Sequence, residues 1–260
     1  MKEFIDITVL SILQGVAEFL PISSSGHLVI GQHFLGVNAP GLRLDTFLHA
    51  GTLVSIFVFY RKTVASLVCG MARGSRESWT YAAKILLSAM PAVAVYVLFE
   101  EKVEALFENA KMVGALLMFT AAVLAITKYL PKGEESPTFK NAFAMGLMQA
   151  IALLPGVSRS GMTLTASRIC RMTPEKAAEF SFLMSAPLIG GAALMHIVEA
   201  FSGNAPQDEI SWSMTLYGAA LSAVVGYFSL SLLVKSLKSR GFWMFGIYCF
   251  AAGLLTLCFC

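Results

Sequence analysis

The sequence predicts an all-α polytopic membrane protein, and its composition, its long apolar stretches and its charge asymmetry carry that prediction. Of the 260 residues, 57% are hydrophobic and only 13% are charged, with a mean hydropathy of +0.71. A soluble domain is typically about 45–50% apolar and about 25% charged, so this chain cannot cover a water-facing surface. The composition excludes a soluble globular domain and a disordered chain. A net charge of only +3, without a long basic run, indicates no nucleic-acid partner.

Six apolar stretches approach the length of a full membrane span, which takes about 20 residues of helix. They are residues 44–60, 79–99, 112–130, 178–200, 213–234 and 242–260. The connections between them are short, so we expect a single membrane domain over residues 1–260.

Two further apolar stretches end in a proline followed by small polar residues, and each continues into a segment too short to span. The first pair is 4–20 and 28–36, and the second is 141–154 and 162–169. A half-helix, a tight turn and a second half-helix make a re-entrant hairpin. Non-helical backbone at membrane depth is tolerated only where it is buried in protein or lines a wet cavity. The sequence therefore predicts two re-entrant hairpins in addition to the six spans.

An internal repeat relates the two hairpins without a gap. A shift of 135 residues places Gln14 on Gln149 and Phe47-Leu48 on Phe182-Leu183, and it superposes the hairpin turns: Ser23, Ser25 and Gly26 fall on Ser158, Ser160 and Gly161. The repeat halves are approximately residues 1–130 and 136–260.

The distribution of Lys and Arg orients the chain. Segments 61–84, 128–140, 168–176 and 235–241 hold fourteen of the nineteen basic residues and are expected on the cytoplasmic side. The loops assigned to the other side carry acidic residues, namely Glu100, Glu101, Glu104, Glu108, Asp208 and Glu209. The first hairpin then enters from outside and the second from inside. This is an inverted-topology repeat, which typically has its site near the membrane midplane where the broken helices meet.

Polar residues at membrane depth are costly, which makes them candidates for function. In the first hairpin, Gln14 and Glu18 are four residues apart and share a helix face. Ser24 and His27 are three apart, and a hydroxyl beside an imidazole is a nucleophile–base arrangement. The alternative is structural: a serine that caps a half-helix and a histidine that is hydrogen-bonded in the interior.

The second hairpin adds an arginine among hydroxyl groups. Arg159 stands between Ser158 and Ser160 just before a half-helix, and Thr163 follows one turn later. Hydroxyls, free N–H groups at a helix start and a guanidinium together favour an anion, in particular a phosphate. Ser23 and Ser25 are the matching candidates in the first hairpin. The alternative for Arg159 is a structural ion pair with Glu18.

His49, at the start of the first full span, has two interpretations that the sequence leaves open. It either supports the residues that contact the substrate or is a packed histidine of the helix bundle.

These residues resemble the bacterial undecaprenyl-diphosphate phosphatases, also called bacitracin-resistance proteins. The likeness covers essentially the whole chain and rests on three motifs: Gln14-x-x-x-Glu18-Phe19-Leu20-Pro21, Ser23-Ser24-Ser25-Gly26-His27 and Pro155-Gly156-Val157-Ser158-Arg159-Ser160-Gly161-Met162-Thr163. The commonest form of the family has a second acid where Gln14 stands, and glutamine is a known variant. Glu18 is then the one carboxylate of that pair, which puts in doubt any mechanism that needs two acids.

The resemblance implies a phosphatase that converts undecaprenyl diphosphate to undecaprenyl phosphate, which recycles the lipid carrier of peptidoglycan synthesis and confers bacitracin resistance. We expect Ser24 to attack the terminal phosphorus with His27 as base, and His27 as direct nucleophile is the competing interpretation. Arg159 and the hairpin serines would hold the diphosphate. Glu18 would bind a divalent cation, Mg²⁺ or Ca²⁺, or orient water, and Gln14 would be a neutral ligand of that ion or a hydrogen-bond partner. Both ions favour oxygen ligands.

The expected setting is the bacterial cell (inner) membrane, with the site opening to the periplasmic or outer face. The partners are the polyprenyl diphosphate substrate and the lipid bilayer, and a homodimer is left open. A transporter for lipid phosphates is the alternative function, because inverted repeats with broken helices are common in transporters. A nucleophile–base pair distinguishes the two, since a carrier does not need one.

Overall fold

The computed structural model describes residues 1–36, 42–107, 109–131, 133–202, 210–237 and 241–260. Within these ranges the chain forms twelve α-helices and one short 3₁₀ helix, and it forms no β-strand apart from an isolated bridge between Glu135 and Met172. The predicted all-α class is confirmed.

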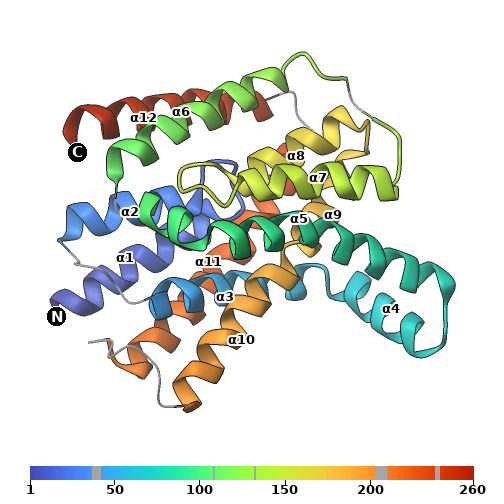
Figure 1. Ribbon diagram of the computed structural model, residues 1–260, viewed down its shortest axis with the longest axis horizontal. Coiled ribbons are helices and arrows are strands. Elements are labelled where there is room, and N and C mark those ends of the chain that lie inside the picture. The colour runs from blue at the N-terminus through green and yellow to red at the C-terminus, as the bar shows by residue number, and fades with distance from the viewer. Residues whose placement is uncertain (37–41, 108, 132, 203–209, 238–240) are drawn as a thin grey trace.

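The helices follow the chain as a bundle (Figure 1). In order they are α1 (Lys2–Ala17), α2 (Ser24–Leu35), α3 (Leu42–Phe59), α4 (Arg61–Ala72), α5 (Arg76–Phe107), α6 (Ala110–Ile126), α7 (Phe139–Ile151), α8 (Arg159–Ile169), α9 (Pro174–Leu183), α10 (Ala186–Ser202), α11 (Trp212–Leu237), the 3₁₀ helix η1 (Phe242–Met244) and α12 (Phe245–Phe259).

Four helical segments in the described residues are long and apolar enough to cross a membrane. They are Arg76–Phe107, Pro174–Met195, Trp212–Leu237 and Phe242–Phe259. α3 and α4 make a fifth only as a pair, because they are bent by 80° at their junction, and α6 is a shorter apolar helix. The chain is therefore a multi-pass membrane protein, and the count of six full spans remains a prediction.

Both predicted hairpin turns are breaks between helices. α1 ends at Ala17 and α2 begins at Ser24, while α7 ends at Ile151 and α8 begins at Arg159. α2 and α8 thus begin 135 residues apart, as do α6 and α12, in agreement with the spacing of the sequence repeat. The re-entrant placement in a membrane and the boundaries of the repeat halves remain predictions.

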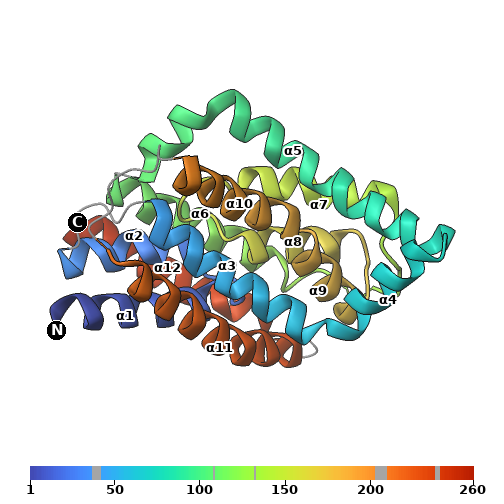
Figure 2. The ribbon, with the colours of Figure 1, turned by 90° about the horizontal axis from the view of Figure 1, so that it is seen from below.

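The two broken pairs enter the bundle from opposite ends. Figures 1 and 2 show α1 running inward from the end that holds both chain termini, and α7 running inward from the end near α4. α4 and the connection between α6 and α7, which the charge rule assigns to one membrane side, lie at that same end (Figure 1). Six residues that also entered the orientation argument lie outside the described residues: Glu108, Lys132, Asp208, Glu209, Lys238 and Arg240.

Small residues allow the closest helix contacts. A Cβ on Gly51 of α3 would lie 2.1 Å from the carbonyl oxygen of Ala219 in α11. A Cβ on Gly253 of α12 would lie 2.6 Å from the carbonyl oxygen of Gly114 in α6. Such contacts suit a membrane interior, where helix association depends on close packing rather than on the hydrophobic effect. Large apolar side chains cover the outside instead, for example Val97, Leu232 and Leu255.

The orientation makes a testable prediction about two exposed positions. In a chain whose five native cysteines are replaced, Glu104→Cys lies in a segment expected outside, and Arg73→Cys lies in one expected inside. A membrane-impermeant maleimide added to intact cells should label the first position and not the second. The reverse pattern would overturn the orientation, and labelling of both only after permeabilisation would place them on the same inner side.

Candidate active site

The site is built where the two helix breaks meet. Ser23 and Ser158 are the N-caps of α2 and α8, and their hydroxyls accept hydrogen bonds from the backbone N–H groups of Gly26 (3.3 Å) and Gly161 (3.1 Å). Serine is a preferred N-cap because its oxygen satisfies an N–H that has no partner within the helix. The two breaks are in contact, since the Ser160 hydroxyl of α8 donates to the Leu20 carbonyl oxygen of the first break at 3.1 Å. Ser24 is the first residue of α2.

The carboxylate of Glu18 is the centre of the polar cluster. It follows the last residue of α1, and it is only 5% exposed. Its Oε2 accepts hydrogen bonds from the Ser24 hydroxyl at 2.7 Å and from Gln14 Nε2 at 3.1 Å. Its Oε1 pairs with Arg159 Nη2. Both oxygens of Glu18 thus have partners, one set from the first break and one from the second.

Arg159 is held on its other side by α9. Its Nη1 donates to the Ser181 carbonyl oxygen at 3.3 Å, and its guanidinium carbon lies 5.8 Å from the ring centre of Phe182. The Thr163 hydroxyl, which is buried, bonds the Arg159 carbonyl oxygen at 2.8 Å and the Ser181 hydroxyl at 2.6 Å. These contacts fix the guanidinium so that it faces Glu18.

The structure does not pair Ser24 with His27. The Nδ1 atom of His27 is 2.8 Å from the Ser23 carbonyl oxygen, and its Nε2 is 2.8 Å from the Tyr248 hydroxyl. Both ring nitrogens therefore have partners other than Ser24, whose hydroxyl is directed at Glu18. In this geometry the carboxylate, rather than the imidazole, is arranged to receive the serine proton.

His49 lies beside the cluster, and its role there remains a prediction. Its Nε2 is 3.6 Å from Glu18 Oε2, and its Nδ1 is 2.7 Å from the Asp45 carbonyl oxygen. The Asp45 carboxylate in turn accepts from Gln32 Nε2 of α2 at 3.0 Å. His49 thus connects the site carboxylate to the contacts between α2 and α3.

The remaining hydroxyls predicted to bind phosphate have hydrogen-bond partners within their own turn, and one of them, that of Ser160, also joins the two turns. Ser160 donates to the Leu20 carbonyl oxygen at 3.1 Å, and its hydroxyl is 3.2 Å from that of Ser158. The Ser25 hydroxyl lies 3.4 Å from that of Ser23. Ser158, Ser160 and Ser23 are buried, whereas Ser24, Ser25 and Arg159 are partly exposed and are the groups that an anion reaches first.

Gln14 has the group best suited to a cation. Its Oε1 is buried and has no hydrogen-bond partner, while its Nε2 is bonded to Glu18. An unpaired buried amide oxygen next to a carboxylate fits a hard divalent ion. Among the residues that the structure describes, no group of three or more His, Cys, Asp or Glu side chains is arranged to hold a metal. Further ligands would come from water or from a bound phosphate.

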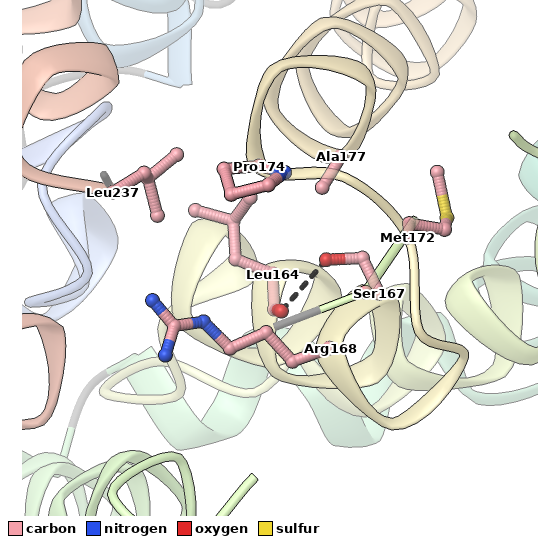
Figure 3. A pocket seen from close by; sticks show the side chains of 8 residues that line it. Leu164, Ser167, Arg168, Met172, Pro174, Ala177 and Leu237 are labelled. Carbon is pink, nitrogen blue, oxygen red and sulfur yellow. Dashed lines mark hydrogen bonds between the residues drawn. The ribbon is translucent and has the colours of Figure 1, made fainter. Parts of the chain in front are cut away.

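A small pocket lies elsewhere on α8 and contains none of the predicted site residues. Its polar side chains are Ser167 and Arg168 at the C-terminal end of the helix, facing Pro174 and Leu237 (Figure 3). The Ser167 hydroxyl donates to the Leu164 carbonyl oxygen at 2.8 Å. Arg168 lies with its guanidinium carbon 5.0 Å from the ring centre of Phe242. We therefore assign the site to the Glu18–Arg159 cluster and not to this pocket.

Tyr248 and Ser181 are site residues that the sequence analysis missed. Tyr248 stands 221 positions after His27 in an apolar helix, and nothing in its local sequence distinguishes it from a lipid-facing tyrosine. Ser181 had a weak signal, because it precedes Phe182, one of the residues in the internal repeat.

The family model and the relatives that match this chain point to the same protein family. The family model for "Bacitracin resistance protein BacA" matches residues 7–255. A protein from Desulforapulum autotrophicum named undecaprenyl-diphosphatase is 34% identical over an alignment of 267 positions, gaps included, which covers 96% of this chain and 95% of that protein. A protein of the same name from Christiangramia forsetii is 36% identical, with 99% and 98% of the two chains covered.

The close approach of the two turns makes a prediction about stability. A Cβ on Gly26 would lie 2.9 Å from the Cα of Gly156, which is backbone and cannot move aside easily. Gly26→Ala should therefore destabilise the protein by about 1–3 kcal/mol and lower its melting temperature in detergent. Gly31→Ala in the same helix is the control, because its Cβ would meet no backbone but the ends of two leucine side chains, Leu13 Cδ1 at 2.9 Å and Leu10 Cδ2 at 3.3 Å. Equal melting temperatures for the two variants would contradict the close contact of the turns.

Proposed function

The chain belongs to the bacitracin resistance protein BacA family, and we propose that it hydrolyses undecaprenyl diphosphate to undecaprenyl phosphate and inorganic phosphate. This reaction returns the lipid carrier to peptidoglycan synthesis, and it counters bacitracin. The named activity of relatives that match nearly the whole chain supports the proposal.

One observation carries the chemistry: a serine hydroxyl, a carboxylate and an arginine are joined in one cluster at two helix N-termini. Ser24 donates to Glu18 at 2.7 Å, and Arg159 pairs with the other oxygen of the same carboxylate. The first turn of a helix has N–H groups without intrahelical partners and the positive end of the helix dipole. α2 and α8 direct these two ends at one place, which is an arrangement suited to a phosphate.

Diphosphate binding is assigned to Arg159, Ser25 and the first-turn N–H groups of α2. The guanidinium forms bidentate charge-assisted bonds with phosphate oxygens, and its contacts with Ser181 and Phe182 keep it in place. Ser23, Ser158, Ser160 and Thr163 support these groups from the interior. Because the donors are fixed before the reaction, they stabilise the charge that develops on the transferring phosphoryl group.

In the proposed reaction, Ser24 Oγ attacks the terminal phosphorus and its proton passes to Glu18 Oε2, its existing hydrogen-bond partner. The bond between that phosphorus and the bridging oxygen breaks, and undecaprenyl phosphate leaves with the electron pair. Water then attacks the phosphoserine, and the Ser24–phosphorus bond breaks to release inorganic phosphate. Glu18 is suited to return its proton to the Ser24 oxygen in this second step.

His27 has a supporting part in this version of the reaction. As a direct nucleophile it would first have to give up the Tyr248 hydroxyl or the Ser23 carbonyl oxygen. His49, 3.6 Å from Glu18, is placed to hold the carboxylate in position.

A divalent cation, Mg²⁺ or Ca²⁺, is proposed at Gln14 Oε1 and Glu18, and when bound it would offset the negative charge of the diphosphate. The unpaired oxygen of Gln14 supports this assignment. With Gln14 in place of a second acid, the site presents one fewer negative charge to the ion.

We place the protein in the bacterial inner membrane with the site open to the outer face. The prenyl tail can then lie in the bilayer while the diphosphate reaches the two turns. The entry of α1 from the end assigned to the outside supports this placement (Figure 1).

The first test is inorganic phosphate release from undecaprenyl diphosphate by the purified protein in detergent, with and without Mg²⁺ or Ca²⁺. We expect metal-dependent release and a fall of at least about 10²-fold in Arg159→Ala, because the phosphate loses its charged partner. Folded protein that releases no phosphate with either metal would overturn the phosphatase. Transport of labelled lipid phosphate across vesicle membranes would then favour the carrier.

The nucleophile is tested by Ser24→Ala, which should lower kcat on the order of 10³-fold or more because the attacking oxygen is lost. Ser229→Ala in α11 is the control, since that hydroxyl donates only to the Val225 carbonyl oxygen of its own helix at 3.0 Å. Turnover is quenched in acid, which preserves phosphoserine, and in a parallel sample in alkali, which preserves phosphohistidine, and peptide mass spectrometry should find phosphate on Ser24. Near wild-type turnover in Ser24→Ala would exclude the serine, and phosphohistidine at residue 27 would favour the competing mechanism.

A further inference from the structure

The last helix of the chain contacts the first turn of the site at two successive residues. The Tyr248 hydroxyl is 2.8 Å from His27 Nε2, and the Cys249 thiol donates to the Pro21 carbonyl oxygen at 3.5 Å. The rings of Tyr248 and His27 are also nearly parallel, with centres 5.6 Å apart and an angle of 14° between their planes. α12 is thus joined to the residues that precede and follow Ser24.

The hydrogen-bond partners of His27 define where its ring proton lies. A carbonyl oxygen can only accept, so the Nδ1 atom that contacts the Ser23 carbonyl carries the proton. In the neutral ring Nε2 then accepts from the O–H of Tyr248. The Ser23 carbonyl oxygen therefore fixes the tautomer, and the tyrosine hydroxyl, bonded to the opposite nitrogen, helps to fix the orientation of the imidazole.

The imidazole in turn supports a backbone conformation that is rarely adopted. Ser23 has φ = 71° and ψ = 98°, a region that side-chain-bearing residues avoid. Such a residue persists only when its surroundings hold it. The Ser23 carbonyl oxygen accepts from His27 twice, from the backbone N–H at 3.1 Å and from Nδ1 at 2.8 Å. This turn places Ser24 next to Glu18.

Tyr248 makes this contact from an unusual position. Its side chain is 49% exposed, and it belongs to a helix whose main packing partner is α6. α12 is fixed there by close glycine contacts, with Gly246 against Ala121 and Gly253 against Gly114. The packing of α12 against α6 therefore fixes the position of Tyr248, although its side chain is half exposed. Its hydroxyl points toward the interior and contacts His27.

We propose that Tyr248 is a positioning residue of the active site: its hydroxyl orients His27, and His27 holds the Ser23 turn that presents Ser24 to Glu18 and to the phosphate. This inference rests on the proposed phosphatase function and deepens it. Since Tyr248 acts through the orientation of the nucleophile, its loss should reduce turnover more than substrate binding.

The test is Tyr248→Phe, which removes the hydroxyl and keeps the ring. We expect kcat to fall about threefold to tenfold, the factor that corresponds to one net hydrogen bond, with KM within about twofold of the wild-type value. Tyr217→Phe is the matched control, because its hydroxyl lies 3.1 Å from Thr8 Oγ1, away from the helix breaks. A wild-type kcat in Tyr248→Phe, or an equal fall in Tyr217→Phe, would overturn the proposal.

A second arm removes the residue through which Tyr248 acts. In His27→Asn, the side-chain amide N–H can take the place of Nδ1 and donate to the Ser23 carbonyl oxygen. The asparagine side chain is too short to replace Nε2, so the contact with Tyr248 is lost. In that background Tyr248→Phe should change kcat by less than about 1.5-fold, and a full additional fall would show that Tyr248 acts by another route.

A third readout does not depend on turnover. In protein labelled with ¹⁵N-histidine, the His27 Nε2 signal, assigned by its loss in His27→Asn, should shift in Tyr248→Phe and stay in place in Tyr217→Phe. An unmoved signal would overturn the positioning role. If the wild-type protein released no phosphate, the proposed function would fail while this spectrum still decided the contact between Tyr248 and His27.

Discussion

The ion pair between Glu18 and Arg159 is the interaction on which the rest of the site depends. Removing a carboxylate and a guanidinium from water costs several kcal/mol per ion, and that cost is offset only when the groups meet with good geometry and further hydrogen bonds. Glu18 is 5% exposed, and its second oxygen accepts from Ser24 and Gln14. The two helix breaks, far apart in the sequence, therefore have to lie against each other for the buried carboxylate of Glu18 to be paired with Arg159.

Arg159 and the turn that carries Ser24 are held in place by different parts of the bundle. Arg159 is supported by Ser181 and Phe182 of α9, whereas the turn around Ser24 is supported by α12 through Tyr248 and Cys249. Hydrogen-bond donors and charges that are fixed before the substrate binds stabilise the transition state without having to rearrange during the reaction. A membrane bundle suits this requirement, since its helices pack at fixed glycine contacts and its interior excludes water from the buried pair.

The sequence predicted the helical membrane class, both helix breaks and most of the polar cluster, because intramembrane polar residues and small-residue turns are rare enough to be informative. It did not predict which acceptor Ser24 would use. Spacing along α2 favoured His27, but the carboxylate comes from the preceding turn, and a turn's path is not encoded in helical periodicity. Tyr248 was not predictable either, because a tyrosine in an apolar helix has the same local sequence whether it faces lipid or a histidine. α6, with 17 residues, is shorter than a full span, so the span expected over residues 112–130 remains a prediction.

The most direct test of the central ion pair is a double-mutant cycle on stability in detergent with Glu18→Gln, Arg159→Gln and the variant that carries both changes. Arg159→Gln leaves the buried carboxylate without its partner and should destabilise the protein by about 3–5 kcal/mol, whereas Glu18→Gln leaves a partly exposed guanidinium and should cost less. The double variant has no unpaired charge, and we predict that it is more stable than either single variant. Strictly additive losses would show that the two residues do not interact, and the account of how the two helix breaks form one site would then be wrong.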